Sequence, residues 1–211
     1  GQNRGEAGAV VLGVADLCNY YAALAVELEP GKKVRTGPFP GRSNRIYYRP
    51  AGVVAVISPW NYPFFLAMAQ IIPALAAGNA VVHKPSEHSP RVGLLIGELC
   101  RAAGVPEGVL QVVIGDGSTG AGIIGARVDV ISFTGAPPTG RRVMEAAAKH
   151  LTPVVLELGG KDAAIVCEDA DLERVANGIT WGAFLNAGQT CIAVKRVIAD
   201  EKIYEPLVKM L

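Results

Sequence analysis

The sequence of 211 residues is long enough for one large domain, or for one domain and part of another. Hydrophobic residues make up 50% of the chain and charged residues 18%, so a sizeable core can be buried. The formal net charge of +1 gives no electrostatic argument for a nucleic-acid partner, and no basic run indicates binding to a membrane surface.

Residues 7–28 are apolar with helical spacing, which predicts a helix. Asp16, Asn19 and Glu27 interrupt this stretch, so we expect no membrane span, and no charged segment marks a signal peptide. Both ends look abrupt, because the chain starts beside one apparent helix and stops at Leu211 inside another. This suggests a fragment.

Residues 31–50 are richer in Gly, Pro and Arg, and they contain two extended stretches, 33–36 and 44–49, that predict a hairpin. Its polar strands predict an edge that pairs with another subunit, or equally an edge in contact with solvent.

From residue 53 onward, continuous apolar strands alternate with helices, which indicates a parallel sheet covered on both faces. The predicted fold is therefore α/β, with an open, mostly parallel, Rossmann-like sheet. The expected strands are residues 53–57, 80–84, 110–114 and 128–133. One helix is expected after the turn at 58–63 and runs to Ala77, and the others are expected at 91–103, 121–124 and 139–149.

The alternation loosens after Pro153. Strands are expected at 154–158 and 163–166, and a helix at 172–185 with Asp171 as its cap. We therefore predict a first domain over residues 1–157 and the truncated start of a second α/β domain over 158–211.

The four cysteines form no CxxC pair, and the three histidines are too scattered for a zinc cluster. We therefore expect no metal site and a reducing compartment such as the cytoplasm. Cys18, Cys100 and Cys167 have apolar neighbours, which predicts buried thiols that behave as small hydrophobic residues.

Asn61 lies in the stretch PWNYP, directly after a predicted strand. Ligands of open parallel sheets bind beyond the carboxyl ends of the strands, and two prolines stiffen this turn and can aim the Asn61 amide. On this stretch alone, Asn61 can equally be the cap of the following helix.

Lys84 and Glu87 also follow a strand, in the stretch KPSE. Such a pair suits a ribose, because the Lys donates hydrogen bonds and the carboxylate accepts them from hydroxyls. The alternative is a solvated loop pair of little energetic value.

Two further stretches follow strands. GDGSTG, at 115–120, is a weak match to a phosphate loop, because Asp129 comes too soon to be its acidic partner, so we predict no Rossmann diphosphate site there. The stretch 133–140 joins a strand to a helix with prolines near the helix start, which leaves backbone N–H groups suited to a phosphate.

Glu157 ends an apolar run, where a carboxylate is awkward to bury without a purpose. A partly apolar setting suits a general base, although a single Glu more simply pairs with a nearby Lys. Cys191 follows Gly188, which lets the backbone turn and present the sulfur in a cleft. A buried, inert cysteine is the plainer alternative.

Taken together and in this order, PWNYP, KPSE, GDGSTG, FTGA, ELGGK and GQTC resemble the motif series of the NAD(P)-dependent aldehyde dehydrogenase superfamily. The resemblance runs from about Gly31 to the end of the chain. ELGGK begins with Glu157 and GQTC ends with Cys191, 34 residues later. These two motifs form the most specific pair of the series.

The resemblance implies the oxidation of an aldehyde to a carboxylic acid. Cys191 would be the nucleophile that forms a thiohemiacetal, and Asn61 with the Cys191 backbone N–H would form the oxyanion hole. Hydride leaves to the nicotinamide and a thioester remains, which water activated by Glu157 hydrolyses.

The resemblance also implies a set of cofactor contacts, among which Lys84 and Glu87 hold the adenosine ribose. Glu87 would repel the extra phosphate of NADP, so NAD is favoured. The implied contacts are Ile57, Ser58, Pro59, Trp60, Lys84, Ser86, Glu87, Gly117, Phe133, Thr134, Gly135, Ala136, Thr139 and Leu158.

Two features depart from the family pattern. Ala136 stands where the family usually has Ser, which removes a hydroxyl contact worth about 1 kcal/mol, and the loop between Gly120 and Asp129 looks short. In addition, the family's catalytic domain continues far beyond Leu211. We therefore expect the 211-residue chain alone to bind NAD weakly and to turn over little aldehyde.

Two other functions were weighed. A CoA-acylating aldehyde dehydrogenase does not need the hydrolytic base Glu157, and a non-catalytic NAD-binding or structural protein would have no use for Cys191, Glu157 and Asn61 together.

The expected partner is a small aldehyde, and semialdehydes, betaine aldehyde and long-chain aldehydes all stay open. Tyr62, Phe65 and Trp181 either line the substrate path or belong to the core. The hairpin at 31–50 resembles the family's oligomerisation element, which implies a homodimer or homotetramer.

Overall fold

The computed structural model describes residues 2–28, 31–34, 37 and 41–211. The chain divides into two compact units: the larger comprises Ala7–Glu157, and the smaller comprises Leu158–Leu211 together with Gly1–Glu6.

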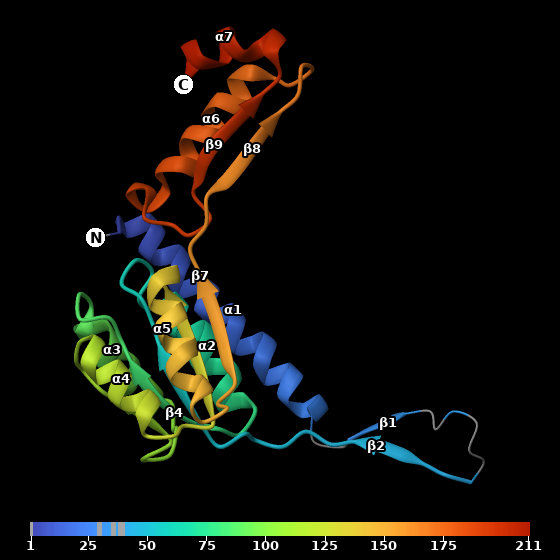
Figure 1. The fold of residues 1–211 in the computed structure, drawn as a ribbon, viewed down its shortest axis with the longest axis vertical. Coiled ribbons are helices and arrows are strands. Elements are labelled where there is room, and N and C mark those ends of the chain that lie inside the picture. The colour runs from blue at the N-terminus through green and yellow to red at the C-terminus, as the bar shows by residue number, and fades with distance from the viewer. Residues whose placement is uncertain (1, 29–30, 35–36, 38–40) are drawn as a thin grey trace. The chain divides into compact units, whose positions relative to one another are not determined.

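The larger unit is built on a five-stranded sheet with the strand order β5-β4-β3-β6-β7. Figure 1 labels two of its strands, β4 and β7, and the helices α2, α3, α4 and α5 of the same unit. Neighbouring strands are parallel in the pairs β3–β4, β3–β6 and β4–β5. The predicted α/β fold with a mostly parallel sheet is confirmed. The strands are β3 (Val53–Ile57), β4 (Ala80–Lys84), β5 (Leu110–Val112), β6 (Val130–Gly135) and β7 (Val154–Leu158).

Helices cover both faces of this sheet, because each central strand is apolar on both sides. Alternation along β3 sends Val54 and Val56 into one core cluster and Ala55 and Ile57 into another. The first cluster includes residues of α2 (Phe65–Ala76) and α3 (Pro90–Ala102), and the second includes residues of α4 (Gly117–Gly125) and α5 (Pro137–Ala148).

Helix α1 (Arg4–Leu28) is mostly exposed, with only Val14 buried among its residues. By length and composition alone it is the one helix of the described chain that can cross a membrane. A single helix of this kind near the N-terminus is weak evidence, because helices of soluble cores and signal sequences have the same properties.

The predicted hairpin is confirmed as an antiparallel pair, β1 (Lys32–Val34) and β2 (Asn44–Ile46), in which Lys33 faces Arg45. The expected first strand extended to residue 36, but residues 35 and 36 lie outside the described residues.

The smaller unit pairs two parallel strands, β8 (Asp162–Val166) and β9 (Val194–Ala199). Its core joins Val166 to residues of α6 (Leu172–Phe184) and α7 (Glu201–Met210). Asp171 caps α6 as predicted, since its Oδ1 accepts from the Arg174 N–H at 3.2 Å. Strand β9 was not predicted.

The prediction for the cysteines is wrong at two positions. Cys100 is buried, but Cys18 and Cys167 are exposed. Cys18 lies on the exposed helix α1, and Cys167 comes directly after Val166, the last buried residue of β8. Apolar neighbours in the sequence therefore did not ensure a buried thiol.

Candidate active site

The carboxyl ends of the three central strands bring together most of the predicted cofactor residues. β3 lies between β4 and β6, and Ile57 is in register with both Lys84 and Phe133. The turns that follow these strands are therefore neighbours. Strand order reverses at β3, and such a switch point is where open parallel sheets bind ligands.

Ser58 follows β3 and is held from two directions. Its backbone N–H donates to the Lys84 carbonyl at 3.1 Å, and its Oγ lies 2.9 Å from His83 Nε2. His83 is fully buried, and burial, together with the charge of Lys84, lowers the pKa of His83 to about 4. A neutral ring therefore supports Ser58. His83 was not among the residues predicted for the site, although a histidine inside an apolar strand is a signal of a buried polar contact.

Lys84 is buried rather than solvated, which rules out the simple surface pair considered above. Its Nζ donates to the Pro85 carbonyl at 2.8 Å and lies 3.8 Å from Glu87 Oε2. Burial lowers the pKa of Lys84, and the carboxylates of Glu87 and Asp116 oppose this effect. The buried Lys84 Nζ is thus held close to the exposed carboxylate of Glu87.

The loop between Lys84 and α3 is further ordered by Ser86, whose Oγ accepts from the His88 N–H at 3.3 Å. The Trp60 ring, from the turn after β3, meets the His88 ring edge to face at 6.5 Å between centroids. The turns after β3 and β4 are therefore in direct side-chain contact.

The stretch GDGSTG is mostly helix rather than loop, since α4 begins at Gly117. Asp116 caps it by accepting from the Ser118 N–H at 2.9 Å and from the Ser118 hydroxyl at 2.6 Å, and these bonds lower the pKa of Asp116. Gly115 has a steric role, because a Cβ there would lie 1.9 Å from Thr119 Oγ1. The helix start is occupied by its own cap.

The stretch FTGA ends a strand and starts a helix, as predicted, although β6 continues through Thr134 and Gly135. Thr134 Oγ1 accepts from Gln70 Nε2 at 2.7 Å, a contact that the sequence did not indicate. Ala136 is the N-cap of α5 and makes no side-chain cap. Pro137 and Pro138 have no N–H, and the Thr139 and Gly140 N–H groups both donate to the Ala136 carbonyl at 3.0 Å, so this helix start has fewer N–H groups for a phosphate than the sequence predicted.

Asn61 is half-buried in the turn that starts at Pro59. It is not the helix cap considered as an alternative, because α2 begins at Phe65 with Phe64 in the N-cap position. The structure thus leaves the Asn61 amide in the turn beyond β3.

Glu157 does not lie in the partly apolar setting that was expected. It is exposed on β7, the edge strand, where alternation buries Val154 and Leu156 in part and turns Val155 and Glu157 outward. Leu158, the next residue, is also exposed and begins the smaller unit.

Cys191 lies in the smaller unit and is exposed. The loop before it contains an unusual backbone, because Asn186, Ala187 and Gly188 have φ values of 52°, 57° and 72°. This left-handed conformation costs about 1–2 kcal/mol for Ala187, whereas Asn and Gly adopt it more readily. Strain of this kind persists only where surrounding contacts enforce it, and it is concentrated at functional sites.

The same unit places Gly160 of ELGGK beside Cys191. A Cβ on Gly160 would lie 3.9 Å from the Cys191 carbonyl oxygen, and Asp162 is in register with Val194. Asn61 and Glu157 belong to the larger unit, so their convergence with Cys191 stays a prediction.

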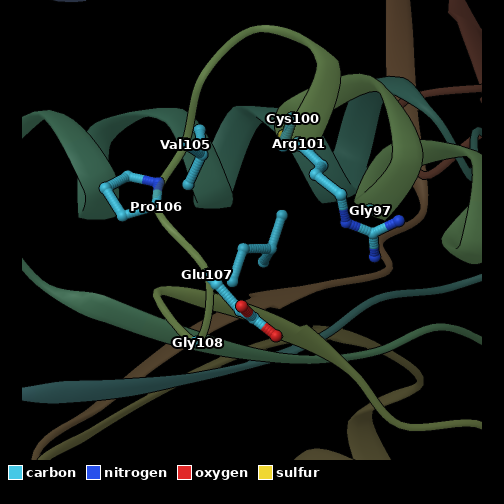
Figure 2. Close-up of a pocket in the computed structure, with 8 residues that line it drawn as sticks. Gly97, Cys100, Arg101, Val105, Pro106, Glu107 and Gly108 are labelled. Atoms are coloured by element: carbon cyan, nitrogen blue, oxygen red, sulfur yellow. The ribbon is translucent and has the colours of Figure 1, made fainter.

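A small cavity of about 160 Å³ lies elsewhere, between the end of α3 and the loop that leads to β5 (Figure 2). Arg101 and Glu107 contribute its charged groups, and Cys100 and Val105 are among its other lining residues. It opens near Leu110, at the amino end of β5, and is smaller than ordinary ligand pockets of about 300–1,000 Å³. None of the predicted site residues lines it.

An open, mostly parallel sheet with polar groups gathered at its switch point is typical of α/β proteins that bind ligands beyond the carboxyl ends of their strands. The chain belongs to the aldehyde dehydrogenase family, whose model matches residues 1–211.

Two curated relatives illustrate the similarity. The chain is 49% identical over 200 residues to 4,4'-diapolycopene aldehyde oxidase of Methylomonas sp, covering 94% of this chain and 38% of that protein. It is 45% identical over 187 residues to the peroxisomal aminoaldehyde dehydrogenase 1 of Pisum sativum, covering 87% of this chain and 37% of that protein. The chain thus spans less than two fifths of these relatives' length.

Solved structures share the fold. The NAD-dependent aldehyde dehydrogenase from Sinorhizobium meliloti matches with a TM-score of 0.93 and 38% identity, over 100% of this chain and 42% of that one. A betaine aldehyde dehydrogenase from Staphylococcus aureus in complex with NAD+ matches with a TM-score of 0.85 and 37% identity, over 91% of this chain and 38% of that one.

Proposed function

We propose that this chain is part of an enzyme that oxidises an aldehyde to a carboxylic acid with NAD+, and that Cys191 is the nucleophile. The observation that carries the proposal is the strained loop before Cys191, next to the ELGGK glycine, in a chain of the aldehyde dehydrogenase family. Backbone strain of this kind clusters at active sites and ligand clamps, which supports a functional role for this loop.

The carboxyl edge of the sheet fits NAD+. Lys84 and Glu87 offer a donor and an acceptor for ribose hydroxyls, and the positive end of the α5 helix dipole, at the same edge of the sheet, suits a diphosphate. When bound, NAD+ accepts a hydride. The exposed carboxylate of Glu87 favours NAD+ over NADP+, because it repels a 2′-phosphate.

The first half-reaction uses Cys191 and Asn61. The Cys191 thiolate forms a C–S bond to the aldehyde carbon, and the carbonyl oxygen becomes an oxyanion. The Asn61 amide and the Cys191 backbone N–H donate to this oxygen. As the C=O bond re-forms, the aldehyde hydrogen leaves as hydride with its electron pair, and a thioester remains on Cys191.

The second half-reaction uses Glu157 as general base. It takes a proton from water, whose oxygen then bonds to the thioester carbon. The C–S bond breaks, Cys191 leaves as the thiolate, and the carboxylic acid is released. Exposure of Glu157 leaves it open to that water.

The direct test is to trap the thioester in a chain of the relatives' full length. We expect acid quenching after addition of aldehyde and NAD+ to leave an acyl group on Cys191, and more of it in Glu157→Gln. Cys167, also exposed, is the internal control and should stay unmodified. NADH formation at the wild-type rate in Cys191→Ala would overturn the proposal.

The aldehyde is proposed only as a class. Relatives carry names that refer to diapolycopene aldehyde, aminoaldehydes, betaine aldehyde and 2-hydroxymuconic semialdehyde. Trp181 is exposed in the smaller unit and Phe65 lies beside Gly13 of α1, so Trp181 is the better candidate to meet substrate. Measuring kcat/KM for a panel of apolar, cationic and carboxylated aldehydes would show which class the enzyme prefers.

We also propose a homodimer or homotetramer that uses the β1–β2 hairpin, whose described strand residues are mostly exposed. Light scattering on a chain with this hairpin deleted should give a monomer. Four free thiols support a reducing compartment such as the cytoplasm, which cell fractionation would check.

A further inference from the structure

Glu6, at the start of α1, contacts two segments at once. Its Oε2 accepts from the Asn3 N–H at 3.4 Å while Asn3 Oδ1 accepts from the Glu6 N–H at 2.9 Å, which is a capping box. Its Oε1 accepts from the Asn186 N–H at 3.2 Å. All three residues belong to the smaller unit.

Asn186 is the first residue of the left-handed turn and is 7% exposed. A buried N–H group needs an acceptor, and a carboxylate is a stronger one than a neutral oxygen. Glu6 therefore satisfies the backbone at the point where the chain enters its strained conformation.

The turn is connected by hydrogen bonds to the residues that precede Cys191. The Asn186 carbonyl accepts from the Gln189 N–H at 3.2 Å and from Gln189 Nε2 at 3.0 Å. The Leu185 carbonyl accepts from the Thr190 hydroxyl at 3.2 Å. A change at Asn186 is thus transmitted to Thr190, the residue next to Cys191.

We propose that Glu6 is a positioning residue for Cys191, acting through the Asn186 N–H to hold the left-handed turn. The inference rests on the proposed function, because it takes Cys191 to be the nucleophile. It assigns a role in the chemistry to a residue that the sequence places 185 positions before the cysteine.

Three substitutions separate this role from helix capping. Glu6→Ala removes the acceptor of the Asn186 N–H and one half of the capping box. Asn3→Ala disturbs the same helix start but leaves the contact with Asn186. Glu6→Gln retains an oxygen that accepts from Asn186, so it should rescue the turn.

Steady-state kinetics of a full-length chain give the main readout. We expect Glu6→Ala to lower kcat about tenfold or more, because small displacements of reacting groups are costly. KM for NAD+ should stay within about twofold, since the cofactor residues lie in the other unit. Asn3→Ala and Glu6→Gln should both stay within about threefold of wild-type kcat. Equal losses in Glu6→Ala and Asn3→Ala would overturn the inference.

Should Glu6→Ala fail to fold, Glu6→Asp keeps the charge and the helix-start preference but is shorter by one methylene. It should show the same fall in kcat, and wild-type kcat in Glu6→Asp would count against the inference. Hydrogen exchange of residues 185–193 should be faster in both variants, and unchanged exchange would also refute it.

Failure of the proposed function gives a different result. An active Cys191→Ala variant would show that Cys191 is not the nucleophile and would reject the proposed function. An inactive Cys191→Ala variant, with Glu6→Ala as active as Asn3→Ala, would reject only the role of Glu6.

Discussion

The carboxyl edge of the sheet and the Cys191 loop are built in different ways. At the edge, strand register sets the positions of Ile57, Lys84 and Phe133, and Ser58 is then held by hydrogen bonds with His83 and with the Lys84 carbonyl. The loop before Cys191 is instead held by hydrogen bonds within residues 185–190 and by side chains from outside it, such as the Glu6 carboxylate and the Lys195 ammonium. The fold thus sets the positions of the predicted cofactor residues, whereas local side-chain contacts set the conformation of the loop before Cys191.

The largest effect is expected from a substitution in the loop that contains Cys191. Cys191→Ala should lower aldehyde oxidation by on the order of 10⁴-fold or more, because no other group can form the thioester. Affinity for NAD+, measured by calorimetry in a full-length chain, should change little. A comparable loss of NAD+ affinity would show that the two regions are not separable.

Glu157→Gln should have the next largest effect. Removal of a general base slows its step by about 10²–10⁴-fold, so kcat should fall while a rapid first burst of NADH persists. Rapid mixing measures both quantities. Loss of the burst together with kcat would place Glu157 in the first half-reaction.

His83→Met tests how the cofactor edge is held. The pKa of His83 is lowered from 6.5 to about 4 in the folded protein, so as pH falls the unfolded chain takes up the proton first. The free energy of unfolding should therefore fall between pH 6.5 and pH 4, by at most about 3 kcal/mol from this residue.

Urea unfolding at several pH values measures this dependence. It should be flatter in His83→Met than in wild type. His150→Met, at an exposed histidine, is the matched control and should keep the wild-type slope.

Glu87→Ser has the smallest expected effect, on cofactor choice. Loss of the carboxylate removes repulsion of the 2′-phosphate, so the NADP+/NAD+ ratio of kcat/KM should rise about tenfold. Glu98→Ser, at an exposed glutamate on α3, controls for the change in net charge. An unchanged ratio would mean that Glu87 does not face the ribose.

The sequence predicted the sheet well, because runs such as Val53–Ile57 are apolar throughout and are bounded by Pro and Gly turns. It also located the turns after β3, β4 and β6. It missed β9, where Lys195 and Arg196 interrupt the apolar pattern, and it treated the α4 glycines as loop because glycine is a poor helix former.

The Cys191 region was predictable only in part. The motif located the cysteine, but the left-handed conformation of Ala187 was not predictable, since Ala rarely adopts it, although Asn186 and Gly188 on either side are residue types that do. Glu6 and Gln70 were missed for a similar reason. Their partners, Asn186 and Thr134, are distant in sequence, and such pairings appear only after folding.

The uncapped start of α5 has a thermodynamic consequence. Alanine at an N-cap makes a helix less stable than serine does, by about 1 kcal/mol, so Ala136 leaves this end of α5 more prone to fraying. Pro137 and Pro138 have no N–H, so an anion bound there would stabilise this end chiefly through the positive end of the helix dipole. Occupancy by a dinucleotide would then raise the melting temperature of the larger unit partly by stabilising a helix end, and inorganic diphosphate alone would reproduce that share of the rise.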